Sequence, residues 1–137
     1  MAERMVSRWA GLAPYLLSVM RIVAALMFLQ AGTMKWFGWP MAMPGGGHPA
    51  LLSQMGIGGA LELIGGALLL VGLFTRPVAF VLSGEMAVAY FQFHYPRGFW
   101  PIVNEGQPAV LYCFLWLYIS AAGAGPWSID ALRRRSG

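Results

Sequence analysis

Apolar residues gather in four long runs that carry almost no charge. The runs cover residues 14–36, 56–74, 78–95 and 109–125. A helix needs about 20 predominantly apolar residues to cross a hydrocarbon layer of about 30 Å, and each run is close to that length. The pattern therefore predicts an all-α membrane protein, a four-transmembrane-helix bundle that forms one domain over residues 1–137.

Turn-forming residues separate these runs. Thr75-Arg76-Pro77 divides the second run from the third, and the connection 37–55 holds three prolines and three consecutive glycines. That connection is expected to be a loop or a short re-entrant or interfacial segment. Two arginines precede the first run, as in a signal peptide, but the run is too long for such a segment and lacks a small-residue cleavage site at its end. We therefore expect it to be a span.

Composition supports a membrane protein over a soluble one. The chain is 58% hydrophobic and 10% charged, whereas soluble domains are about one quarter charged. The nine basic residues are scattered among the apolar runs and form no basic face with stacking aromatics, so no nucleic-acid partner is expected. The expected partner is the lipid bilayer. Cys113 is the only cysteine, which excludes an internal disulfide.

The arginines predict the orientation of the bundle. With four spans, both termini share one side with the Thr75–Pro77 turn. Six basic residues then lie on that side: Arg4, Arg8, Arg76, Arg133, Arg134 and Arg135. Only Lys35 and Arg97 lie on the other. The positive-inside rule makes the six-arginine side, and hence both termini, cytoplasmic.

Ionisable residues within a span are costly unless they find partners, so each one marks a structural pair or a functional site. Arg21 and Glu85 each lie seven residues from the cytoplasmic end of their run, which places both at a depth of about 10 Å. Their equal depth predicts a structural ion pair between the first and third helices.

A second polar group is expected near the outer face. Glu62 lies about 10 Å below that face. Four other polar residues lie at the same depth or closer to the outer face. The candidate ligand-binding residues are Lys35, Glu62, Gln92, His94 and Glu105. They predict a polar cavity open to the outer side. The alternative is structural: Lys35 extends to the lipid headgroups, and Glu62 is a buried, protonated or hydrogen-bonded carboxyl group.

Other chemistry has little support in the sequence. His48 and His94 are the only histidines and do not have metal-ligand spacing, so no metal site is expected. No phosphate-binding loop, serine nucleophile, haem, iron–sulfur or flavin motif is present, and no cofactor is evident. Aromatic and methionine side chains would suit a quinone slot, although in membrane helices they more often serve packing.

Several motifs resemble those of one family. The first span contains Arg21, Phe28, Gly32 and Lys35 in order. The second contains Leu61-Glu62-Leu63-Ile64-Gly65-Gly66 and continues to Gly72-Leu73-Phe74-Thr75-Arg76-Pro77. Phe99-Trp100-Pro101 and residues 104–112 lead into the last span, and Gly125-Pro126-Trp127-Ser128-Ile129-Asp130 follows it. Together these segments resemble the DoxX family of small four-span membrane proteins. The family usually has an acidic residue where Gln107 stands, and here the acid is Glu105.

The resemblance implies a multi-pass protein of the bacterial inner membrane that is associated with redox systems, among them thiosulfate-to-quinone electron transfer and oxidative-stress complexes. It implies soluble or membrane redox partner proteins and, as a ligand, a quinone. It does not establish that this chain is an enzyme. Two alternatives stay open, a small proton-coupled transporter, which would commonly be a homo-oligomer, and a non-catalytic membrane assembly scaffold.

Overall fold

The computed structural model describes residues 1–136, and this part of the chain contains helices and no strand. The long helices are α2 (Ala13–Phe37), α3 (Gln54–Val71), α4 (Thr75–Ala89) and α6 (Gln107–Ala122). The short elements are α1 (Ala2–Ala10), η1 (Tyr90–His94), η2 (Tyr95–Arg97), α5 (Pro101–Asn104) and α7 (Ile129–Ser136). The predicted all-α class is confirmed.

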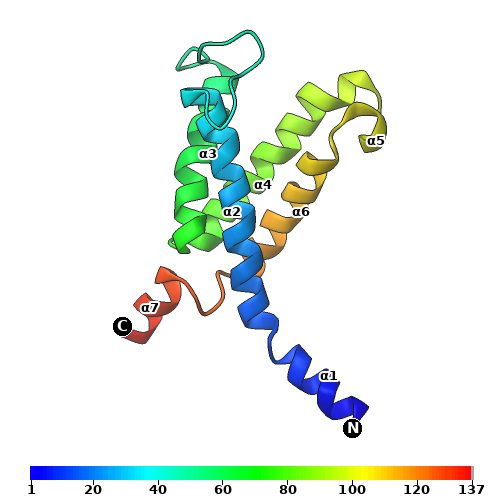
Figure 1. The fold of residues 1–137 in the computed structure, drawn as a ribbon, viewed down its shortest axis with the longest axis vertical. Helices are drawn as coiled ribbons and strands as arrows, with labels where there is room; N and C mark the ends of the chain where they lie inside the picture. Colours follow the sequence, from blue (N-terminus) through cyan, green and yellow to red (C-terminus); the bar gives the residue numbers. More distant parts are fainter. Residues whose placement is uncertain (137) are drawn as a thin grey trace.

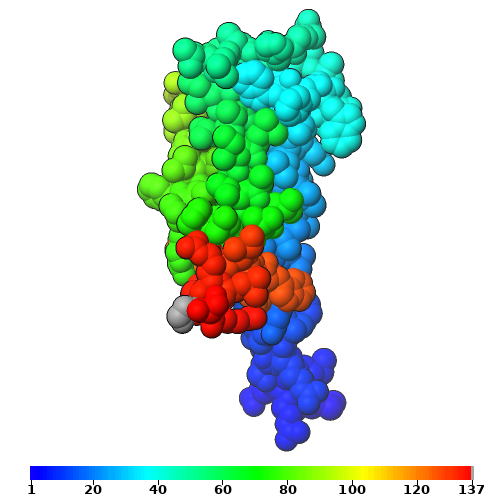
Figure 2. All heavy atoms as spheres, turned by 90° about the vertical axis from the view of Figure 1, so that its left-hand side faces the viewer, coloured from blue at the N-terminus to red at the C-terminus, as the bar shows by residue number. Residues whose placement is uncertain are grey.

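The long helices form two antiparallel pairs, α2 with α3 and α4 with α6 (Figure 1). The two pairs lie close together near the chain termini and diverge toward the opposite end of the molecule. Both termini lie at the same end (Figure 1). We call this the terminal end and the other the distal end. In Figure 2 the C-terminal segment lies across the terminal end of α3, and α1 projects beyond it.

Two of the helices, α2 and α3, are long and apolar enough to cross a membrane. The fourth predicted span corresponds to α6, which is apolar but has 16 residues. The third begins as the 15-residue helix α4 and continues directly into the π-helical turn η1 and the 3₁₀ turn η2. Its distal end is therefore not the regular α-helix that the sequence predicted.

Glycines let α2 and α3 approach closely. A Cβ atom added at Gly32 would lie 2.9 Å from the backbone nitrogen of Leu63, and one at Gly66 would lie 3.3 Å from the backbone nitrogen of Leu29. Side chains at these positions would force the backbones apart. These glycines therefore serve helix packing, as small residues commonly do in membrane bundles.

Aromatic stacking links α2 to the other helix pair. The ring of Phe28 stacks on Tyr112 and Trp116 of α6, with centroid distances of 5.0 and 5.5 Å. Phe28 and Trp116 are buried, together with Leu69 of α3 and Leu82 of α4. The apolar core thus contains side chains from all four long helices.

The predicted ion pair between Arg21 and Glu85 is wrong. Arg21 is 0% exposed, and its guanidinium donates to backbone carbonyl groups. Nε donates to Leu69 at 2.8 Å, Nη2 to Trp127 at 2.7 Å, and Nη1 to Ala124. The Leu69 carbonyl belongs to the last turn of α3, where carbonyls lack partners within the helix. Equal depth misled the prediction because it considered only side chains as partners for the arginine.

The segment after α6 folds back and caps α4. The carboxylate of Asp130 accepts hydrogen bonds from the backbone nitrogens of Phe74 and Thr75, each at 2.9 Å, and its own backbone nitrogen donates to Gly72 at 2.9 Å. Gly72 has a φ of +71°, which ends α3. Two family-like motifs distant in sequence, Gly72–Pro77 and Gly125–Asp130, thus meet at the terminal end.

Replacing Asp130 with asparagine is expected to lower the free energy of unfolding by about 1 kcal/mol, because the N-terminus of α4 loses a negatively charged cap. Burial alone would raise the pKa of Asp130, but the hydrogen bonds from Thr75 and Phe74 and the charge of Arg133 lower it overall. The stabilisation is thus complete above pH about 4 and is lost as the pH falls through the depressed pKa. Unfolding in mild detergent at pH 7 and at pH 3 should show a smaller difference in stability between wild type and variant at pH 3 than at pH 7. An equal difference at both would contradict this role.

Candidate functional site

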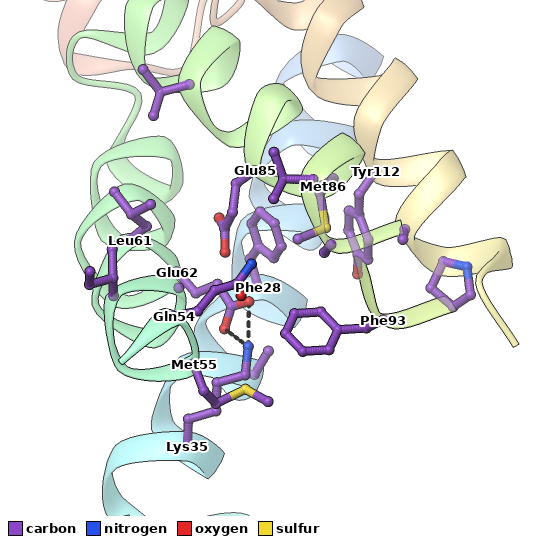
Figure 3. A pocket seen from close by; sticks show the side chains of 18 of the residues that line it. Phe28, Lys35, Gln54, Met55, Leu61, Glu62, Glu85, Met86, Phe93 and Tyr112 are labelled. Atoms are coloured by element: carbon purple, nitrogen blue, oxygen red, sulfur yellow. Dashed lines mark hydrogen bonds and ion pairs between the residues drawn. The ribbon is translucent and has the colours of Figure 1, made fainter. Parts of the chain in front are cut away.

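A cavity of about 870 Å³ lies between the two helix pairs toward the distal end. Its walls come from α2 and α3 on one side and from α4, η1 and α6 on the other. Most of the lining is apolar, and the larger apolar and aromatic side chains include Phe28, Leu61, Met86, Phe93 and Tyr112 (Figure 3). The space is within the range of about 300 to 1,000 Å³ that small-molecule sites occupy.

An ion pair between Lys35 and Glu62 lies in this cavity (Figure 3). Nζ of Lys35 donates to both carboxylate oxygens of Glu62, at 2.7 and 2.9 Å. The carboxyl side chain is 4% exposed and the lysine side chain 17%. The sequence placed both groups near the outer end of the bundle, and the structure brings them into direct contact.

Local sequence explains how the pair forms. Lys35 stands in the last turn of α2, where a positive charge interacts favourably with the helix dipole. Glu62 is on α3, and Gly59 one turn before it faces α2, so that a Cβ atom there would lie 3.3 Å from Cβ of Lys35. The same Cβ atom would lie 2.9 Å from Nε1 of Trp36. The glycine therefore lets the last turn of α2, which carries Lys35, approach α3 closely.

Glu85 of α4 also points into the cavity, toward the Lys35–Glu62 pair (Figure 3). A Cβ atom added at Gly58 of α3 would lie 3.3 Å from its Oε1, and its Oε2 is buried without a hydrogen-bond partner. The cavity thus holds two carboxyl groups and one ammonium group. The sequence did not predict this role, because the equal depth of Glu85 and Arg21 indicated an ion pair between them. The sequence did carry one indication of this role. Glu85 lies near the middle of its span, and a glutamate side chain at that depth can point toward either end of the bundle.

The other predicted site residues divide between the cavity and its surroundings. His94 lines the cavity, and its Nδ1 lies 3.0 Å from the carbonyl oxygen of Asn104. Gln92 is outside the lining and accepts a hydrogen bond from Gln54, which does line it. This bond joins the start of α3 to η1 at the distal end. The assignment of His94 and Gln92 to ligand binding stays a prediction.

Glu105 lies away from the cavity. Its side chain is 79% exposed and forms an ion pair of 3.7 Å with Arg97. The residue ends α5 with a φ of +60°, and this left-handed turn is followed by the start of α6. The expected place of Glu105 at the polar cavity is therefore wrong, because the turn places it among the solvent-exposed residues of the α5–α6 connection.

The sequence did not predict the π-helical turn η1. This turn carries Phe93 and His94, both of which line the cavity. A π-turn adds a residue to a helical turn and rotates the side chains that follow, and such turns are frequent at functional sites. No apolar periodicity in residues 78–95 distinguishes it from a regular helix.

Within residues 1–136, no group of three or more histidine, cysteine, aspartate or glutamate side chains is placed to hold a metal ion. The cavity presents the ammonium group of Lys35 and the carboxyl groups of Glu62 and Glu85. These groups donate and accept hydrogen bonds beside aromatic and aliphatic walls.

Comparisons with known proteins identify the family. The DoxX family model matches residues 16–95. An uncharacterized protein of Haemophilus influenzae is 46% identical over 124 residues, which cover 85% of this chain and 90% of that protein. No solved structure matches. The matched region includes Arg21, the Lys35–Glu62 pair and Glu85, and the chain belongs to the DoxX family of membrane proteins.

Proposed function

We propose that this protein is the membrane subunit of a redox system and that its cavity binds the ring of a quinone or of a similar small, polar-headed molecule. The observation that carries the proposal is the buried Lys35–Glu62 pair at one wall of an otherwise largely apolar cavity. Partner proteins, soluble or in the membrane, would exchange electrons with the bound ring.

The donors and acceptors of the cavity suit such a ring. A lysine ammonium has three N–H donors, and Lys35 uses two of them on Glu62. The third can donate to a carbonyl oxygen of the ring. Phe28, Phe93 and Tyr112 line the same space and provide flat apolar surfaces for stacking. Glu85 adds an unpartnered carboxyl oxygen for a hydroxyl group of the reduced ring.

Binding of a short-chain quinone to the purified protein in nanodiscs tests this proposal. Wild type is expected to bind it with a measurable change in tryptophan fluorescence. Replacing Lys35 with methionine, or Glu62 with glutamine, should weaken binding about tenfold or more, since a hydrogen bond that involves a charged group is worth about 1.5 to 3 kcal/mol. Glu105→Gln is the matched control outside the cavity and should bind as wild type does. Unchanged binding in both cavity variants would favour a scaffold instead.

Glu85 favours a second candidate, a small proton-coupled transporter. Because Lys35 is paired with Glu62, the carboxyl group of Glu85 is left to bind a cationic substrate. The substrate would then replace the proton on that carboxyl group. The positive charge of Arg21 would repel a cation nearby. However, its guanidinium group lies at the terminal end of the bundle, where it donates hydrogen bonds to backbone carbonyl groups. Uptake of a lipophilic cation into proteoliposomes, driven by a pH gradient and absent in Glu85→Gln, would select this candidate over the first.

We also propose that α2, α3, α4 with η1, and α6 all span the bacterial inner membrane, with the terminal end cytoplasmic. The arginines support this orientation, because Arg4, Arg8, Arg76 and Arg133–Arg135 belong to elements of the terminal end, whereas Lys35 and Arg97 belong to the distal end (Figure 1).

Cysteine labelling in intact cells tests the topology. In a Cys113→Ser background, Ala2→Cys and Ser136→Cys should resist an impermeant thiol reagent until the cells are opened, because the membrane shields both positions. Ser53→Cys, in the distal loop, should react in intact cells and serves as the positive control. Labelling of either terminal position from outside would overturn the orientation.

A further inference from the structure

A second cavity, of about 600 Å³, lies at the terminal end between the start of α2, the end of α6 and the C-terminal segment. Leu17, Tyr118 and Ala122 form an apolar wall along the two long helices. Arg134 and Arg135 of α7 line the same cavity. One space therefore joins the side of the helix bundle to two guanidinium groups.

These two arginines are available to a ligand. Within residues 1–136, neither side chain forms an ion pair or a hydrogen bond. Neighbouring arginines are occupied, since Arg76 donates to the carbonyl of Ala121, and Arg133 lies 5.2 Å from the ring centroid of Phe74. Guanidinium groups match phosphate oxygens in geometry and charge.

We propose that this cavity binds an anionic phospholipid, with the phosphate on Arg134 and Arg135 and the start of an acyl chain along Leu17, Tyr118 and Ala122. The apolar wall decides for a lipid over a free phosphate ion, which would gain nothing from it. Basic pockets at the cytoplasmic ends of membrane helices are suited to such headgroups. The site is separate from the distal cavity and does not depend on its ligand.

The character of helix α1 indicates that this cavity lies at the level of the lipid headgroups. It leads into α2 at Ala13, which itself lines the cavity. Met5 and Trp9 share an exposed apolar face of α1, and Arg4 and Arg8 occupy a polar face. A basic amphipathic helix of this kind is typical of membrane interfaces.

The test measures lipid binding to the full chain in mild detergent by native mass spectrometry. Phosphatidylglycerol is the anionic probe and phosphatidylcholine the neutral one. Wild type is expected to retain phosphatidylglycerol preferentially. Arg134→Gln/Arg135→Gln should weaken its binding about tenfold or more. The matched control, Arg4→Gln/Arg8→Gln, removes the same charge at the same end but outside the cavity. Because these arginines lie on a helix at the headgroup level, this variant should weaken binding, but several-fold less than the cavity variant does.

Equal losses in both double variants would overturn the proposal, since they would indicate general attraction between charges. No loss in the cavity variant would also overturn it. Glycerol phosphate in large excess should not displace the lipid, and full displacement would reassign the site to a free anion. If the cavity double variant does not fold, the single variants Arg134→Gln and Arg135→Gln decide, each with an expected loss of several-fold.

Discussion

Replacing Arg21 with methionine is expected to destabilise the folded protein by about 3 kcal/mol or more. Its guanidinium donates buried hydrogen bonds to the carbonyl groups of Leu69 and Ala124 and a partly buried one to that of Trp127. Each buried acceptor that loses its donor costs about 1 to 3 kcal/mol. The loss would also remove the hydrogen bonds by which Arg21 joins the C-terminal segment to the end of α3. Unfolding of the purified protein in detergent, followed by circular dichroism, measures the difference.

Two further variants make the test of Arg21 specific. Arg21→Lys keeps the charge but cannot reach three carbonyl groups with a planar fork, so it should recover only part of the stability. Arg21 and Glu85 share no contact, and their double-mutant cycle should therefore give a coupling below about 0.5 kcal/mol. A larger coupling would mean that the two residues do form an ion pair.

Replacing Lys35 with methionine should destabilise the folded protein to a similar extent, by about 3 to 5 kcal/mol. The substitution leaves the carboxylate of Glu62 buried without its cation, and an uncompensated buried charge is strongly unfavourable. Removing both charges in Lys35→Met/Glu62→Met should restore much of the stability, because neither group is then left unpaired. Thermal unfolding of the two single variants and of the double variant measures this coupling.

The chain contains a matched control for the buried pair. Arg97 and Glu105 form an exposed ion pair, also toward the distal end, with side chains 55% and 79% exposed. Glu105→Gln is expected to change stability by less than about 1 kcal/mol, since solvent and salt screen such pairs. If Lys35→Met were as mild as this control, the Lys35–Glu62 contact would not be a buried ion pair in the membrane.

These two arrangements differ in how far the sequence could predict them. The contact of Lys35 with Glu62 follows from depth, because consecutive antiparallel helices joined by one loop place their adjoining ends side by side. Arg21 could not be treated in this way. Its partners are backbone carbonyls, which every residue possesses and no sequence pattern marks.

The sequence by itself determined the helical class, the four apolar runs, the shared end of the two termini and the family, because hydrophobic length and charge are local properties of the chain. Only the tertiary structure decided that the helices pair as α2–α3 and α4–α6 and that Glu85 joins the cavity. It also decided that the segment after α6 folds back, so that Asp130 caps α4. These features depend on which backbones approach closely and where the chain returns, and such long-range packing is decided by all the contacts of the fold together.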